Sequence, residues 1–110
     1  MNPSVDIRPP FRFLDGKSPS ELFASLPTPC YIIDERALIH NCEVLSSVMK
    51  NTGCRILLAQ KAFSNFAFYP LLSKYLSGTE ASGLYEARLG KEKMPCGEVH
   101  VFCTAYREDE

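Results

Sequence analysis

Residues 56–64 have the sequence ILLAQKAFS, which places Lys61 at the end of an apolar run with more apolar residues close behind it. Lysine is among the side chains least often found inside a protein, because removing its ammonium group from water without a partner is costly. Two interpretations are open. Residues 55–60 can form a strand covered on both faces with Lys61 at its carboxyl end, or residues 55–76 can form one long helix with Lys61 on its solvent side.

The pattern on both sides of this stretch favours the strand. Apolar runs bounded by turn residues predict strands, and apolar residues at spacings of three and four predict helices. The predicted strands are residues 30–33, 55–60, 79–82 and 98–103, and the predicted helices between them are residues 34–50, 64–76 and 84–89. Alternation of this kind with short connections is typical of βαβ units and of a parallel sheet.

A parallel sheet needs cover on both faces or closure into a barrel. A (β/α)8 barrel takes about 250 residues, so the 110 residues of this chain would hold only its first third. We therefore expect an α/β fold that is the first part of an incomplete barrel. Residues 1–26 are expected to form an N-terminal arm and a short helix, and residues 27–110 the truncated start of the barrel domain.

Single residues mark the expected ends of the helices. Asp34 is a natural N-cap for the helix that follows it. Pro70 falls inside the helix predicted at residues 64–76, so we expect it to kink or restart that helix. Gly78 is expected to end the same helix.

Composition narrows the range of functions. Hydrophobic residues make up 45% of the chain and charged residues 23%, which is ordinary for one globular domain. The formal net charge of −1 provides no basic surface for nucleic acid or an anionic membrane, and neither a membrane-spanning run nor a secretory signal is visible. Five cysteines without a C-x-x-C pair predict reduced thiols, packed as small apolar residues in a cytoplasmic protein without a zinc site.

The position predicted for Lys61 gives its amine a chemical role. Barrels of this class keep their chemistry at the carboxyl ends of the strands. Partial removal from water at that end would leave more of the amine neutral and nucleophilic, as a lysine that forms an imine with a carbonyl group requires. We therefore expect a reactive amine at the mouth of the barrel.

Four segments carry a resemblance to a known family. They are TPCYIIDERAL at residues 28–38, ILLAQKAFS at 56–64, GTEASGLYEARLG at 78–90 and GEVHVFCTAY at 97–106. In this order and spacing they resemble the N-terminal part of the carboxynorspermidine (carboxyspermidine) decarboxylases, and the likeness runs from about Leu26 to Tyr106. That family depends on pyridoxal 5′-phosphate (PLP), has the alanine racemase-like fold, and is more distantly related to ornithine and diaminopimelate decarboxylases.

The resemblance implies a reaction and a set of site residues. The reaction is the removal of CO2 from carboxynorspermidine or carboxyspermidine, which gives norspermidine or spermidine in polyamine biosynthesis. Lys61 matches the lysine that attaches PLP covalently, and Glu80 and Glu86 match acidic residues beside the cofactor and in its supporting shell. Ser82 is a further candidate for lining that pocket. Gln60 departs from the expected pattern, which has a small or apolar residue before the lysine.

The resemblance also implies parts that this stretch does not contain. In the family, the groups that hold the phosphate and the pyridine nitrogen, and a proton donor shared across a homodimer interface, come later in the chain. A C-terminal β domain follows the barrel, and residues 30–33 would be a strand of that domain. We therefore expect the 110-residue chain alone to lack decarboxylase activity and to bind PLP poorly.

Two other interpretations stay open. In the first, the chain is an alanine racemase-like protein that holds PLP for cofactor homeostasis or regulation, without turnover. In the second, it is a remnant that acts only through exposed apolar surface, because an opened barrel leaves strand edges and core faces uncovered.

The remaining prominent side chains are expected to be structural. His40 should lie in solvent and His100 between the layers of the fold, because it alternates with valines in a predicted strand. Tyr106 follows that strand in a loop and needs no function. The aromatic side chains within residues 63–69 are expected to form core for the helix that covers the first strand. They are not expected to stack on nucleic acid, since no basic groove accompanies them.

Overall fold

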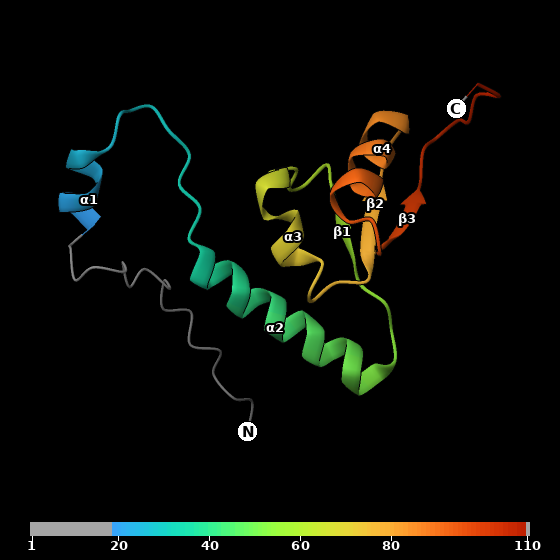
Figure 1. Ribbon diagram of the computed structural model, residues 1–110, viewed down its shortest axis with the longest axis horizontal. Helices are drawn as coiled ribbons and strands as arrows, with labels where there is room; N and C mark the ends of the chain where they lie inside the picture. The colour runs from blue at the N-terminus through green and yellow to red at the C-terminus, as the bar shows by residue number, and fades with distance from the viewer. Residues whose placement is uncertain (1–18, 110) are drawn as a thin grey trace. The chain divides into compact units, whose positions relative to one another are not determined.

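The computed structural model describes residues 19–109, which fall into two compact units divided between Leu38 and Ile39 (Figure 1). The elements are, in chain order, α1 (Pro19–Ser25), α2 (Glu35–Thr52), β1 (Leu57–Ala59), η1 (Phe66–Phe68), α3 (Tyr69–Leu72), β2 (Gly78–Ala81), α4 (Leu84–Lys93) and β3 (Glu98–Val101). The short helix predicted before residue 26 is confirmed as α1, and the arm predicted before it lies outside the described residues. The domain boundary at residue 26 stays a prediction.

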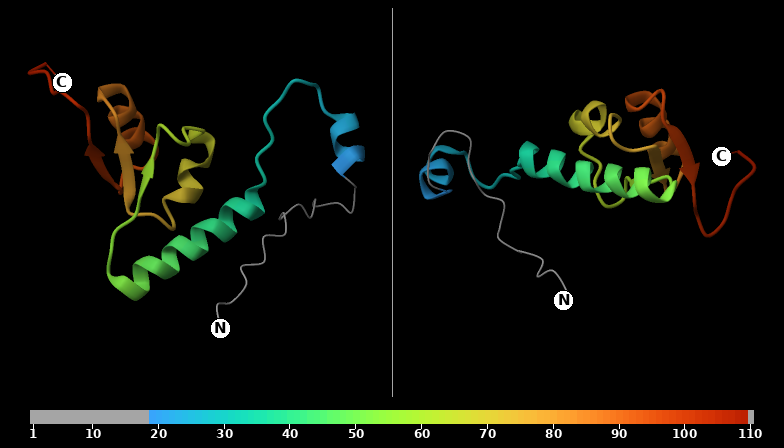
Figure 2. Two further views of the ribbon diagram at one scale, coloured as in Figure 1. Left: turned by 180° about the vertical axis from the view of Figure 1, so that it is seen from behind. Right: turned by 90° about the horizontal axis from the view of Figure 1, so that it is seen from below.

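The second unit is built on a parallel sheet of three strands in the order β1-β2-β3. Leu58 pairs with Thr79, which in turn pairs with Val99. Figures 1 and 2 show the strands running in the same direction, so their carboxyl ends meet at one edge of the sheet. We call this the carboxyl edge, and its last strand residues are Ala59, Ala81 and Val101. The predicted α/β class with a parallel sheet is confirmed.

The helix α2 begins and ends at defined contacts. The carboxylate Oδ1 of Asp34 accepts hydrogen bonds from the backbone N–H groups of Arg36 at 2.9 Å and Ala37 at 3.1 Å, which confirms Asp34 as the N-cap. Near the other end of the helix, the sulfur of Met49 accepts from the N–H of Ile56 at 3.2 Å and from the Ser77 hydroxyl at 3.5 Å. Met49 therefore holds the end of α2 beside the amino ends of β1 and β2.

The strand predicted at residues 30–33 is not formed. These residues have no regular structure, and the side chain of Tyr31 is fully exposed. A strand needs a neighbour that pairs its backbone N–H and C=O groups. The sheet formed by the described residues contains only β1, β2 and β3, so residues 30–33 have no pairing partner in it.

The helix predicted at residues 64–76 is instead two shorter pieces. The 3-10 helix η1 is followed directly by α3, with Pro70 in the first turn of α3. Proline has no N–H to donate, so a helix tolerates it at the start and not in the interior. The restart at Pro70 is therefore the correct alternative. Gly78 does not end this helix, because it is the first residue of β2, where a Cβ atom would overlap the backbone of Glu98 on β3.

The helix α4 lies close against β2 because Gly90 has no side chain. Gly90 and Thr79 are both buried. A Cβ atom on Gly90 would overlap Thr79 Oγ1 and lie 3.1 Å from Gln60 Nε2. Thr79 and Gln60 therefore belong to the face of the sheet that α4 covers. Since side chains alternate along a strand, Glu80 lies on the opposite face of β2.

We predict that Gly90→Ala lowers the free energy of unfolding by about 1–3 kcal/mol, because the added methyl group forces α4 away from β2. The matched control is Gly83→Ala at the start of the same helix, where a Cβ atom would meet nothing within 4 Å. The control should lose only about 0.5 kcal/mol, since alanine is slightly less favourable than glycine at an N-cap. Urea unfolding of both variants measures the difference, and equal losses would contradict the close approach.

Candidate functional site

Lys61 lies in a tight turn directly after β1. The carbonyl oxygen of Ala59, the last residue of β1, accepts hydrogen bonds from the N–H groups of Ala62 at 3.0 Å and Phe63 at 3.3 Å. The alternative of one long helix over residues 55–76 is therefore wrong, and the position at the carboxyl end of a strand is confirmed. The Lys61 side chain is exposed, so the expected partial removal from water is not provided by the described residues.

Glu80 is half-buried near the end of β2. Its registered neighbours are Ala59 on β1 and His100 on β3. In a parallel sheet, registered neighbours project to the same face, so these three side chains share the face opposite α4. The carboxylate of Glu80 is thus the acidic group that the described sheet places on that face next to the end of β1.

Ser82 and Glu86 are brought together by a hydrogen bond. The backbone N–H of Ser82 donates to Glu86 Oε2 at 2.7 Å. Glu86 lies in the first turn of α4, where a carboxylate can satisfy N–H groups that have no partner within the helix. The Glu86 side chain therefore shapes the loop between β2 and α4. Within residues 19–109, no ion pair joins Lys61 to either glutamate.

Gln60 is the polar side chain at the centre of this region, and only 1% of it is exposed. Its Nε2 donates to the backbone oxygen of Glu86 at 2.9 Å and to that of Glu80 at 3.4 Å. Its Oε1 accepts a hydrogen bond from the hydroxyl of Tyr69 at 3.2 Å. In the sequence, Gln60 stands out only as a departure from a family pattern. A polar residue that ends an apolar run is a signal that a buried hydrogen-bond network is needed there.

Tyr69 completes this network from α3. Its side chain is fully buried. Burial raises the pKa of the Tyr69 phenol above its ordinary value, and the negative charge of Glu86 raises it further. The phenol is therefore neutral at physiological pH and remains a hydrogen-bond donor to Gln60.

The structure also places the two histidines and Tyr106. His100 is exposed on the face opposite α4, and its Nε2 lies 2.8 Å from Glu98 Oε2, so it does not pack between layers. His40 is in solvent as predicted. The Tyr106 hydroxyl donates to the backbone oxygen of Val101 at 3.0 Å, and the ring is mostly exposed.

The aromatic cluster and the cysteines are less buried than predicted. Tyr69 is core, whereas Phe66 is 54% exposed. The cysteines among the described residues are free thiols, and Cys42 is the one that is buried. Burial raises the pKa of the Cys42 thiol, which keeps it protonated and unreactive. Cys30, Cys54 and Cys96 are exposed, so they do not pack as small apolar residues.

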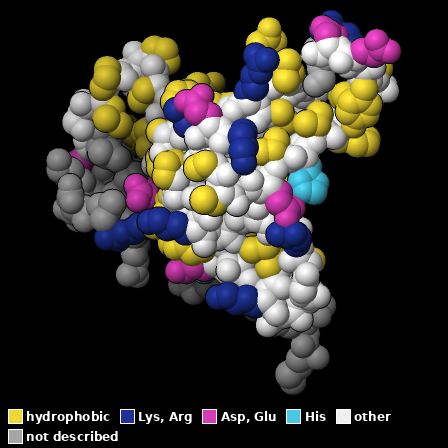
Figure 3. Space-filling model, turned by 45° about the vertical axis from the view of Figure 1, so that its right-hand side comes forward, with side chains coloured by type: hydrophobic (Ala, Val, Ile, Leu, Met, Phe, Trp, Pro, Cys, Tyr) yellow, Lys and Arg dark blue, Asp and Glu magenta, His cyan; other side chains and the backbone are white. Residues whose placement is uncertain are grey.

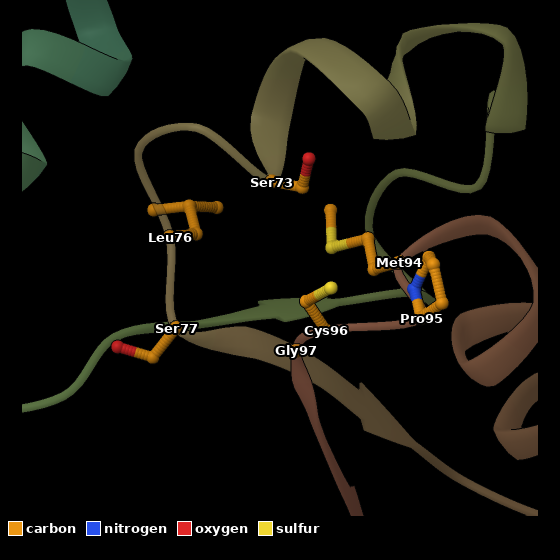
Figure 4. A pocket seen from close by; sticks show the side chains of 7 residues that line it. All are labelled: Ser73, Leu76, Ser77, Met94, Pro95, Cys96 and Gly97. Atoms are coloured by element: carbon orange, nitrogen blue, oxygen red, sulfur yellow. The ribbon is translucent and has the colours of Figure 1, made fainter.

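A pocket of about 210 Å³ is present in the second unit, and Figure 4 shows the side chains that line it. It is lined by Ser73, Leu76, Ser77, Met94, Pro95, Cys96 and Gly97. Ser77 precedes β2 and Gly97 precedes β3, so the pocket is at the amino ends of the strands. The candidate site is at their carboxyl ends.

Within residues 19–109 no group of His, Cys, Asp or Glu side chains is placed to hold a metal ion. In the same range no helix is both long and apolar enough to cross a membrane. On the face seen in Figure 3, Lys and Arg side chains are scattered among acidic and apolar ones and form no single basic patch.

The arrangement therefore places a primary amine and the carboxylate of Glu80 at the same edge of a parallel sheet. An exposed lysine on a fixed turn can attack a carbonyl group once it is neutral. The described residues provide no glycine-rich loop that would cradle a phosphate group. The site accounts for covalent attachment of an aldehyde more readily than for anchoring of a phosphate.

Comparison with known proteins gives a consistent set of relatives. No protein-family model matches the chain. Carboxynorspermidine/carboxyspermidine decarboxylase from Herminiimonas arsenicoxydans is 38% identical over 85 residues, which is 77% of this chain. The protein of the same name from Campylobacter jejuni is 40% identical over 88 residues, or 80% of this chain. Carboxyaminopropylagmatine decarboxylase from Synechocystis is 37% identical over 87 residues, or 79% of this chain.

A solved structure matches in shape as well as in sequence. It is carboxynorspermidine decarboxylase from Campylobacter jejuni complexed with norspermidine, with a TM-score of 0.73 and 41% identity over 77% of this chain. The resemblance predicted from the sequence is confirmed by these homologues. The match covers 23% of the solved chain and 22–23% of the curated relatives, so this chain spans less than a quarter of their length.

We predict that Tyr69 makes the free energy of unfolding fall as the pH rises through the alkaline range. The pKa of Tyr69 is raised above its ordinary 10.0 in the folded chain, so the unfolded chain releases this proton at a lower pH. The Tyr69 phenol then makes its full contribution to the free energy of unfolding below about pH 10, and this contribution is lost as the pH rises through the raised pKa. The free energy of unfolding, measured between about pH 8 and pH 11, should fall more steeply in the wild type than in Tyr69→Phe. Parallel curves for the two proteins would contradict the burial of the phenol.

Proposed function

We propose that a protein carrying this segment is a PLP-dependent decarboxylase of carboxynorspermidine or carboxyspermidine, because curated homologues of the segment are carboxynorspermidine/carboxyspermidine decarboxylases. The products would be norspermidine or spermidine, in the biosynthesis of polyamines. The observation that carries the proposal is the exposed amine of Lys61 at the carboxyl edge, inside one of the two most specific segments of the resemblance.

The residues of this chain fit the cofactor at its aldehyde. Lys61 is exposed and lies on a turn fixed by two hydrogen bonds to Ala59, so an aldehyde can approach the amine without displacing core side chains. Bound PLP supplies an electron sink for the electron pair that the departing CO2 leaves behind. The contacts to the phosphate and to the pyridine nitrogen are assigned to other parts of the longer protein, as is the proton donor.

Glu80 would act on the substrate through its charge. It lies on the face opposite α4, which in a closed barrel is the interior. Carboxylates in a cavity of low dielectric attract cations over long range, and polyamine precursors carry several ammonium groups. Ser82 would line the cofactor pocket, and Glu86 would support the loop that carries Ser82, since their hydrogen bond at 2.7 Å fixes the shape of that loop.

The three strands would be the first part of a closed barrel in the longer protein. Both β1 and β3 are edge strands here, so each has backbone groups available for a further strand. We propose that further strands pair with these edges and that two copies of the complete protein form a homodimer with shared sites. The 110-residue chain alone is then inactive, because it lacks the phosphate anchor and the proton donor.

A second substrate has support from one relative. The Synechocystis protein is a carboxyaminopropylagmatine decarboxylase at 37% identity, similar to the identity of the other two relatives. Identity therefore does not separate the two substrate classes. The same amine would serve both, because the carboxylated carbon and its amino group are the parts on which PLP acts.

We predict the outcome of a segment exchange. The matching part of the Campylobacter jejuni decarboxylase, 23% of its length, is replaced by the aligned residues of this chain. The chimera should release CO2 from carboxynorspermidine, and Lys61→Ala in the chimera should reduce release to background, since no other amine replaces the attachment point. Lys74→Ala, which changes another exposed lysine, should keep the activity of the unmodified chimera.

Two outcomes would count against the proposal. A Lys61→Ala chimera that retains full turnover would show that the amine is not used. An unmodified chimera that folds and attaches PLP without turnover would support the alternative of a PLP-holding protein. Measuring CO2 release from carboxyaminopropylagmatine in parallel decides which precursor this segment favours.

A further inference from the structure

We infer that Gln60 is a positioning residue for Lys61. Its hydrogen bonds connect the turn that carries the amine to the loop at Ser82. The inference rests on the proposed role of Lys61 as the PLP-attaching lysine. Gln60 is buried, so it would act on the amine through its hydrogen bonds and not by contact with cofactor or substrate.

The amide of Gln60 is held by partners on three sides. Both donor directions of Nε2 are used, by the backbone oxygens of Glu86 at 2.9 Å and Glu80 at 3.4 Å. The acceptor Oε1 is used by the Tyr69 hydroxyl at 3.2 Å. A buried amide with three such contacts has one favourable orientation, because losing any of them leaves a polar group unpaired away from water.

The backbone next to this amide is fixed as well. The N–H of Gln60 donates to the backbone oxygen of Glu80 at 3.1 Å, which continues the pairing of β1 with β2. The following turn is closed by the N–H groups of Ala62 and Phe63, which both donate to Ala59. The backbone is thus held by hydrogen bonds before and after Lys61, while the Lys61 side chain remains exposed to solvent.

Glu86 connects this turn to the second loop of the candidate site. Its backbone oxygen receives the Gln60 amide, and its carboxylate receives the N–H of Ser82 at 2.7 Å. One residue of α4 therefore contacts both the anchor of Lys61 and the loop that carries Ser82. The spacing between the amine and that loop is set through Gln60. An apolar residue at position 60 would fill the space without setting this spacing.

The first measurement is amide hydrogen exchange in the 110-residue chain with Gln60→Met, which keeps the side-chain volume and removes its hydrogen bonds. The amides of Ala62, Phe63 and Ser82 should exchange about three- to tenfold faster, since each hydrogen bond contributes a modest net free energy. The amide of Gly53, which donates to Met49 in another part of this unit, should be unchanged.

Met94→Ala is the matched control for general destabilisation. Met94 is 1% exposed and lies at the other end of the sheet, beside the pocket. Its truncation leaves a cavity and removes none of the hydrogen bonds of the Gln60 side chain, so it should accelerate exchange at Gly53 and at the three test amides by the same factor. If Gln60→Met behaves like Met94→Ala, Gln60 is merely structural and the inference is wrong.

The second measurement is the rate at which PLP becomes attached to Lys61 in the segment-exchange chimera, trapped by borohydride and located by peptide mass spectrometry. Gln60→Met should slow attachment about three- to tenfold, and Met94→Ala should not. An unmodified chimera that attaches PLP at Lys61, together with an unslowed Gln60→Met chimera, overturns the inference and leaves the proposed function standing. An unmodified chimera with no PLP on Lys61 overturns the proposed function, and the role of Gln60 in attachment falls with it.

Discussion

The need to satisfy one buried side-chain amide constrains the rest of the carboxyl edge. The Gln60 side chain is almost completely enclosed, and an amide in that position is stable only if its donors and acceptor find partners. The partners come from three different elements: Tyr69 in α3, Glu80 in β2 and Glu86 in α4. Each element must therefore hold its place relative to β1. The turn that carries Lys61 is fixed by the same contacts, because Lys61 is the next residue.

Close packing beneath α4 makes this network possible. Gly90 lets the helix approach Thr79 and the Gln60 amide within a distance that any larger residue would prevent. The approach brings the first turn of the helix, with the backbone oxygen of Glu86, within 2.9 Å of Nε2. The network and the packing are thus two consequences of one short helix-to-sheet distance. The network and the packing both lie on the face of the sheet that α4 covers. The face that carries the Glu80 side chain, which is proposed to meet the substrate, takes no part in this packing.

Periodicity predicted much of the fold, because the signals involved are local. The order of strands and helices after residue 34 follows from apolar spacing, and Asp34 marks a helix start through its own side chain. The strand at residues 30–33 failed for the opposite reason: apolar β-formers predict a strand, but pairing depends on a neighbour far along the chain. The placement of His100 failed because alternation along a strand does not show which face the helices cover: His100 shares the face of Glu80, opposite α4, and is exposed there.

The sequence predicted some residues of the candidate site and missed others. The end of β1 located Lys61, and the resemblance named Glu80, Ser82 and Glu86. The importance of Gln60 was hidden, since its partners lie on other elements and become neighbours only on folding. Glu86 similarly proved to have a structural contact, with its carboxylate engaged by the Ser82 N–H. The homologous decarboxylases provide the chemical context, while the contacts explain how this segment would hold its lysine.

The enclosure of the Gln60 amide can be observed directly, because Gln60 is the single glutamine of the chain. Selective 15N labelling of glutamine gives one pair of side-chain N–H signals. If the amide is enclosed by its three partners, this pair should show two well-separated proton shifts, slow exchange with water, and nuclear Overhauser contacts to Tyr69 and Glu86. A pair with solvent-like shifts, rapid exchange and no such contacts would contradict it.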